Sequence, residues 1–172
     1  MQTKTIQIPK FLQSLFGAEQ KLKTLIALCA IGLLSGVMFF IWSLQFLSFT
    51  QALITSLLFI DIVGGVISLR TQATQKHYRH RSKQKNFIVF HSLYGAILLP
   101  FFFDLWADIV FLSIILLLSS YSLIPTTRHR TVFACLLFIL FTIITFSVAS
   151  LTPPLALWFT CLAVKLLFAF RP

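Results

Sequence analysis

Charged residues are scarce in this chain, and acidic residues are nearly missing. Of the 172 residues only 10% are charged, whereas soluble domains carry about 25%. A water-soluble fold of this size could not cover its surface with so few charges. Hydrophobic residues make up 58% of the chain, and they occur in runs of about 20, the length that crosses the hydrocarbon core of a bilayer. The composition therefore predicts an integral membrane protein.

The motifs of several enzyme classes are also missing. The sequence contains no glycine-rich phosphate loop, no GxSxG elbow, no HExxH and no paired carboxylates at helical spacing inside an apolar run. His91 is the one histidine within such a run, so a pair of haem ligands is not expected. The three cysteines, Cys29, Cys135 and Cys161, lie far apart in apolar runs and are predicted to be packing thiols. No cofactor follows from the sequence.

Six apolar runs are present, and they predict an all-α, polytopic bundle of six transmembrane helices within residues 24–172. Pro100, Pro125 and the Pro153-Pro154 pair lie near the ends of runs, where a helix break costs little. The expected helices cover about 24–47, 50–70, 86–103, 105–124, 131–149 and 154–170.

Residues 1–23 have a different composition from the rest of the chain. Lysine and glutamine alternate there with apolar side chains, a pattern that predicts an interfacial amphipathic helix lying on the membrane. A cleaved signal is not expected, because no short apolar core with a small-residue cleavage site follows the lysines. The apolar positions are Ile6, Ile8, Phe11, Leu12, Leu15 and Phe16.

Positive charges are sorted to alternate connections between the apolar runs. The net charge of +10 would suggest nucleic acid for a soluble chain, but this distribution indicates orientation and contact with anionic headgroups instead. The connections near 48–51, 104 and 150–153 contain no lysine or arginine. We therefore expect both termini in the cytoplasm of a bacterial cell, with the protein in its cytoplasmic (inner) membrane. The basic side holds Lys4, Lys10, Lys21, Lys23, the loop 70–86, Arg128, Arg130 and Arg171.

Asp61 and Lys165 are the two charges placed deep in apolar runs. Asp61 lies about ten residues into the second run, roughly 15 Å below the outer surface. Lys165 lies about eleven residues into the sixth run, which crosses in the same direction, so both side chains are expected at one depth. We predict that they face each other around a polar pocket. The alternatives are a purely structural ion pair, or a Lys165 that reaches toward the interface.

Three further residues complete a predicted ligand-binding site. Gly65 follows Asp61 by one helical turn and could leave room for a ligand, a water or a neighbouring backbone. His91 lies roughly 6 Å from the level of Asp61, and Tyr94 is on the same helical face as His91. Asp61, His91 and Tyr94 could form a proton relay or an acid–base pair. Ordinary helix packing for Gly65, and a histidine hydrogen-bonded near the interface, are the alternatives.

The loop 70–86 carries a cluster of basic residues and two histidines. His77 and His80 are three residues apart and could bind a metal, but the surrounding cations disfavour a divalent ion. We expect the loop to bind anionic lipid headgroups or a phosphorylated ligand. The cations that would hold the anion are Arg70, Lys76, Arg79 and Arg81.

Three function classes fit these observations. The leading hypothesis is a transporter, or a membrane subunit of one, that binds or moves a small solute within the bundle. The second is an enzyme that acts on a lipid-like substrate at the cytoplasmic leaflet, with Asp61, His77, His80 and His91 supplying the chemistry. The third is a structural or regulatory protein whose basic loop docks a membrane or cytoplasmic protein partner.

Overall fold

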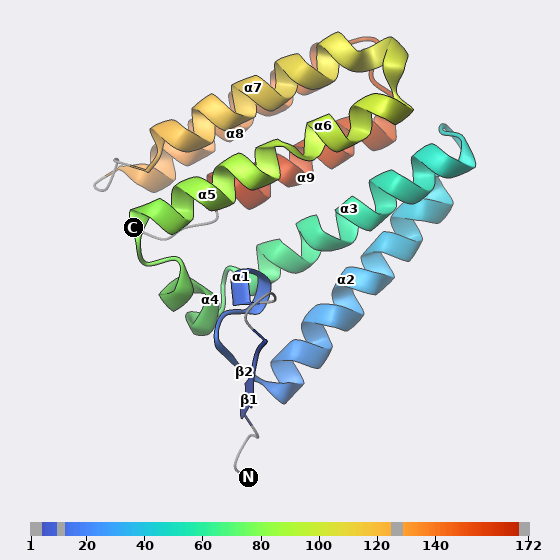
Figure 1. Cartoon of the computed structure of the whole chain (residues 1–172). Helices are drawn as coiled ribbons and strands as arrows, with labels where there is room; N and C mark the ends of the chain where they lie inside the picture. The colour runs from blue at the N-terminus through green and yellow to red at the C-terminus, as the bar shows by residue number, and fades with distance from the viewer. Residues whose placement is uncertain (1–4, 10–12, 125–128, 169–172) are drawn as a thin grey trace.

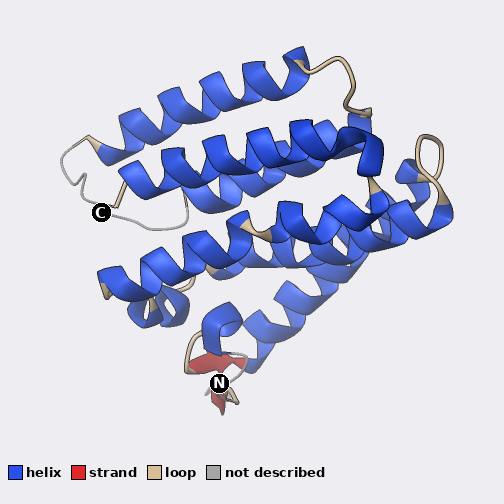
Figure 2. Cartoon of the chain, turned by 45° about the horizontal axis from the view of Figure 1, so that its top comes forward, coloured by secondary structure: helices blue, strands red, loops and turns tan. Residues whose placement is uncertain are grey.

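The computed structural model describes residues 5–9, 13–124 and 129–168, and it shows an all-α protein with one short β-hairpin (Figures 1 and 2). The helices run alongside one another, and the hairpin lies at one end of the helical body. The main helices are α2 (Leu22–Ser43), α3 (Phe49–Ser68), α5 (Arg81–Ser92), α6 (Tyr94–Leu98), α7 (Trp106–Ser122), α8 (Arg130–Ser147) and α9 (Pro153–Leu167).

Among the described residues, four helical segments are long and apolar enough to cross a membrane: α2, α3, α8, and Phe103–Ser122, which joins α7 to the preceding 3₁₀ turn. Their mean hydropathy lies between 1.8 and 2.5. Their outward faces are also apolar, as shown by the exposed side chains of Leu34, Met38 and Leu118. A continuous apolar exterior suits hydrocarbon and would cause aggregation in water. The structure therefore supports an integral membrane protein.

The expected count of six crossings is not confirmed. Helix α9 has 15 residues, which span about 22 Å and fall short of the ~30 Å hydrocarbon core. Helix α5 begins in the basic connection at Arg81, and the helix is interrupted at Leu93 before α6 begins. A 3₁₀ turn at Leu99–Phe101 follows, because Pro100 has no N–H to continue the helix.

Helix α9 forms the centre of the bundle. It packs against α3, α7 and α8, and Figure 1 shows it lying between α8 and α3. The side chains of Trp158 and Phe159 are fully buried, as is the aliphatic part of Lys165. The side chain of Lys165 is consequently surrounded by protein.

The N-terminal segment differs from the expectation of an amphipathic helix over residues 1–23, which is not confirmed. Two strands, β1 (Thr5–Gln7) and β2 (Glu19–Lys21), pair antiparallel, and among the described residues before α2 the helix is limited to α1 (Gln13–Phe16). Gly17 ends α1 with a φ of +77°, a conformation that favours glycine.

Helix α1, between the two strands, packs on α4 (Gln72–His77), which lies in the basic connection between α3 and α5. A Cβ on Gly17 would lie 2.6 Å from the carbonyl carbon of Ala73. The side-chain amide of Gln20 donates a hydrogen bond to Thr71 Oγ1 at 3.1 Å. The N-terminal segment is thus attached to the basic connection by close backbone packing and a polar contact.

The two ends of the helical body carry opposite charge. The α2–α3, α6–α7 and α8–α9 connections lie at one end, and α4 lies at the other (Figure 1). Asp104 lies in the α6–α7 connection and Asp108 in the first turn of α7, where the hydroxyl of Ser150 donates a hydrogen bond to Asp108. Lys4, Lys10, Arg128 and Arg171 fall outside the described residues. The described residues at the α4 end include Arg70, Lys76, Arg79, Arg81, Lys83 and Lys85.

Candidate functional site

Three of the sequence-predicted site residues, His91, Tyr94 and Lys165, converge on one carboxylate oxygen of a fourth, Asp61. The hydroxyl of Tyr94, from α6, donates a hydrogen bond to Asp61 Oδ2 on α3 at 2.7 Å. Lys165 Nζ, from α9, donates to the same oxygen and, at 3.0 Å, to the main-chain carbonyl of Asp61. His91 Nε2, from α5, lies 3.4 Å from Oδ2. We call Asp61, His91, Tyr94 and Lys165 the Asp61 cluster.

Lys165 is sealed inside the bundle. Its side chain has 0% exposure, and Nζ lies 5.8 Å from the ring centre of Phe87 and 5.7 Å from that of Tyr94. An unpaired ammonium in such surroundings would be costly, and two oxygens of Asp61 together with two aromatic rings compensate the charge. Lys165 is therefore a partner of Asp61 and is not available to an incoming ligand.

Gly65 makes the approach of Lys165 possible. A Cβ at this position would overlap Lys165 Cε and lie 2.7 Å from Nζ. Because the glycine has no side chain, the lysine can pass over α3 and reach the carbonyl of Asp61, one turn earlier. The positioning of Lys165 by Gly65 was not anticipated from the sequence.

His91 gives the Asp61 cluster a group that can gain or lose a proton. Its Nδ1 lies 2.8 Å from the carbonyl oxygen of Phe87, which can only accept, so Nδ1 carries the hydrogen. Nε2 is buried and makes no hydrogen bond within the described part of the chain. A neutral ring turns a lone pair toward Asp61, whereas a protonated ring turns an N–H toward it. Proton exchange at Nε2 would thus alter the electrostatics of the carboxylate directly.

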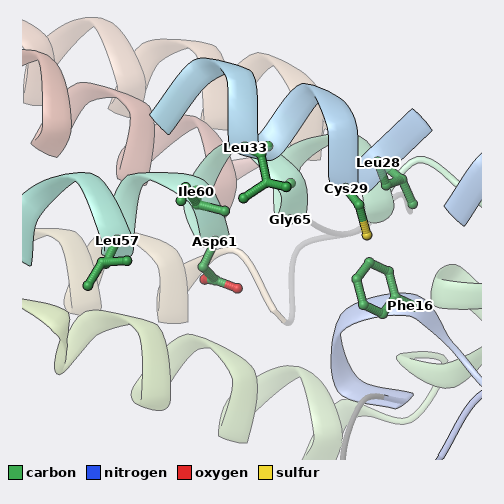
Figure 3. Close-up of a pocket in the computed structure, with 10 residues that line it drawn as sticks. Phe16, Leu28, Cys29, Leu33, Leu57, Ile60, Asp61 and Gly65 are labelled. Carbon is green, nitrogen blue, oxygen red and sulfur yellow. The ribbon is translucent and has the colours of Figure 1, made fainter. Parts of the chain in front are cut away.

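The second oxygen of Asp61 has different surroundings from the first. The side chain is 21% exposed, and no described residue donates a hydrogen bond to Oδ1. Asp61 also lines an open cavity of about 330 Å³ formed by α2, α3 and α1 (Figure 3). Within the described ranges, Asp61 is the one member of the cluster that lines this space, which we call the Asp61 cavity.

Most of the cavity wall is apolar. Figure 3 shows Leu57 and Ile60 beside Asp61 on α3, Leu33 on α2 and the ring of Phe16 from α1. Both Gly64 and Gly65 line the cavity. A Cβ added to Gly64 would meet no atom within 4 Å, so this glycine borders open space. The cavity combines one acidic residue, Asp61, with a largely apolar wall.

The basic connection is separate from the Asp61 cluster. Arg70, Lys76, Arg79 and Arg81 are all exposed, and of these four only Lys76 lines a described cavity, a polar one of about 550 Å³ between α4 and the hairpin. The structure does not gather them into a single binding site. Their expected contact with anionic headgroups stays a prediction.

The two loop histidines also lie apart from the Asp61 cluster. His77 packs edge-on against Tyr78, with ring centres 5.0 Å apart, and His80 precedes α5. Burial and the nearby charge of Lys83 lower the pKa of His77, which favours its neutral form. Residues 5–9, 13–124 and 129–168 contain no group of three or more histidine, cysteine or acidic residues placed to hold a metal ion.

Tyr78 connects the basic connection with the interior. Its side chain is buried, and its ring lies 5.0 Å from that of Phe87, the residue whose carbonyl contacts His91. Burial and the negative charge of Asp61 raise the pKa of Tyr78. This packing was not anticipated, because Tyr78 stands among charged residues, which suggest exposure.

Comparison with known proteins adds no relative. No protein-family model matches the chain, and neither the curated proteins nor the solved structures include a match.

Proposed function

We propose that this protein binds a small solute in the Asp61 cavity and moves it through or within the membrane, as a transporter or a transporter subunit. One observation carries the proposal: Asp61, a carboxylate within an apolar helix, has one oxygen held by an ion pair with Lys165 and also lines an open cavity. The volume of about 330 Å³ falls in the range of small-molecule sites. A carboxylate needed only for helix packing has no reason to border such a space.

The proposal includes six crossings, with α5, α6 and the following 3₁₀ turn forming the third, and α9 a short, enclosed sixth. Arg81–Phe101 would span about 30 Å as one helical path. The acidic residues at one end and the exposed cations at the other support a cytoplasmic basic face and cytoplasmic termini. On this face Arg70, Lys76, Arg79 and Arg81 would contact anionic headgroups or a protein partner.

Native mass spectrometry of the gently extracted protein tests the binding step. The wild type is expected to retain a small molecule, and Gly64→Leu, whose Cβ would meet no atom within 4 Å and whose side chain adds bulk beside the cavity, is expected to lose it. Leu118→Phe is the matched control, because it adds bulk on an exposed face of α7. Retention of the same molecule by Gly64→Leu would contradict binding in the cavity.

Reconstitution of the protein with the retained molecule tests movement. Vesicles loaded with that molecule are expected to release it faster with the wild type than with Gly64→Leu, and the released molecule should have an unchanged mass. A changed mass would instead support the enzyme hypothesis, in which the Asp61 cluster acts on the molecule it holds. Equal release with both variants would contradict transport through this site.

A further inference from the structure

We infer that the ligand of the Asp61 cavity is a neutral amphiphile drawn from the bilayer, with a hydrocarbon tail and a hydroxyl or amide headgroup that donates a hydrogen bond to Asp61 Oδ1. This inference rests on the proposed binding of a solute in the cavity. It specifies the chemical class of that solute and its route of entry.

The charge balance of the Asp61 cluster selects a neutral headgroup. Lys165 is sealed and compensates the Asp61 carboxylate, so the pair is neutral as a whole. A cationic headgroup would add an unbalanced positive charge beside Lys165 in a medium of low dielectric constant. An anionic headgroup would face the carboxylate. A headgroup with an N–H or O–H donor satisfies Oδ1 without adding charge.

The wall of the cavity selects a hydrocarbon tail. Leu28, Leu57 and Ile60 present apolar side chains, and Gly64 leaves an open strip along α3. A polar solute would give up its hydration there and find few hydrogen bonds in exchange. A ligand that is polar only at the end that reaches Asp61 loses nothing by burying the remainder.

The exposed residues that line the cavity indicate how the ligand enters it. Leu33 on α2 and Leu57 on α3 line the cavity and are 57% and 55% exposed. Both belong to helices long and apolar enough to cross the membrane, so the surface around the opening is the one that faces lipid. The ring of Phe16, from α1, lines the cavity as well (Figure 3). The opening is therefore sideways, into the bilayer.

Photolabelling in phosphatidylcholine vesicles tests the inference. The probes are a long-chain alcohol with a diazirine in its chain, the methyl ether of the same alcohol, and the corresponding alkylammonium. We expect the alcohol to label peptides around Leu33 and Leu57 roughly tenfold more than the ether, because only the alcohol donates a hydrogen bond to the carboxylate. The alkylammonium should label no better than the ether.

Two variants assign the labelling to the cavity. Gly64→Leu should reduce labelling by the alcohol to the level of the ether, whereas Leu118→Phe should leave the tenfold preference intact. Both must unfold at the temperature of the wild type in detergent for the comparison to count. Equal labelling by alcohol and ether, preference for the alkylammonium, or an unchanged preference in Gly64→Leu would each overturn the inference.

Failure of the inference can be separated from failure of the proposed function. If a retained molecule disappears in Gly64→Leu while alcohol and ether label alike, the cavity binds a solute of another class and the function stands. If Gly64→Leu changes neither native mass spectra nor labelling, both proposals are overturned.

Discussion

The two sides of α3 at Asp61 differ in how closely they are packed. Toward α9, Ile62 is fully buried and Lys165 fills the space over Gly65. On the other side, Gly64 borders open space. Two neighbouring glycines thus have opposite surroundings. The difference indicates that the packed side contributes stability and that the open side is free to bind, with Asp61 belonging to both.

Replacement of Lys165 is expected to cause the largest loss of stability on the packed side of α3. Lys165→Met removes the cation that compensates the largely buried carboxylate of Asp61, so we expect a loss of about 3–5 kcal/mol in the free energy of unfolding. Reversible unfolding in mixed micelles measures it. The double variant Asp61→Asn/Lys165→Met should recover most of that loss, because no unpaired charge remains. A stable single variant would show that the pair contributes little.

Substitutions at Gly64 and Gly65 compare the open side and the packed side of α3 directly. Gly65→Ala should destabilise the protein by about 1–3 kcal/mol, because its methyl group overlaps Lys165. Gly64→Ala should be neutral or slightly stabilising, by up to about 1 kcal/mol, since alanine favours helix and meets no atom. The unfolding midpoints of the two variants, measured side by side, give the difference. Equal effects would contradict the asymmetry of α3.

Tyr94→Phe should have the smallest effect on the packed side. It removes one hydrogen bond to Asp61 Oδ2 while preserving the ring beside Lys165, so we expect a loss of about 1 kcal/mol. Unfolding in mixed micelles again measures it. A loss as large as that of Lys165→Met would mean that Tyr94, and not the lysine, is the main partner of the carboxylate.

The convergence of the Asp61 cluster could be anticipated because depth follows from counting residues. A rise of about 1.5 Å per residue places Asp61 and Lys165 at one level when their helices run in the same direction. The three-residue spacing of His91 and Tyr94 places them on one face. Counting does not give the rotation of each helix about its axis, and that rotation is set by packing around α9.

Other features depended on contacts that no local pattern records. Residues 1–23 have the pattern of an amphipathic helix, yet Pro9 and Gly17 interrupt it, and the segment is held by the packing of α1 on α4 and by the hydrogen bond from Gln20 to Thr71. These two residues were the available signal. The cavity was not predictable in the same way, because its wall combines residues of α1, α2 and α3 that lie far apart in the sequence. Gly65 was expected to leave room beside the acid, and it is Lys165 that uses this room.

The most direct test of the difference between the packed and open sides of α3 measures both stability and ligand occupancy in Gly64→Leu and in Gly65→Ala. We predict that Gly64→Leu keeps the unfolding midpoint of the wild type and loses the retained molecule in native mass spectra. Gly65→Ala should lower the midpoint by the displacement of Lys165. A Gly64→Leu protein that still holds the molecule, or a Gly65→Ala protein as stable as the wild type, would contradict the account.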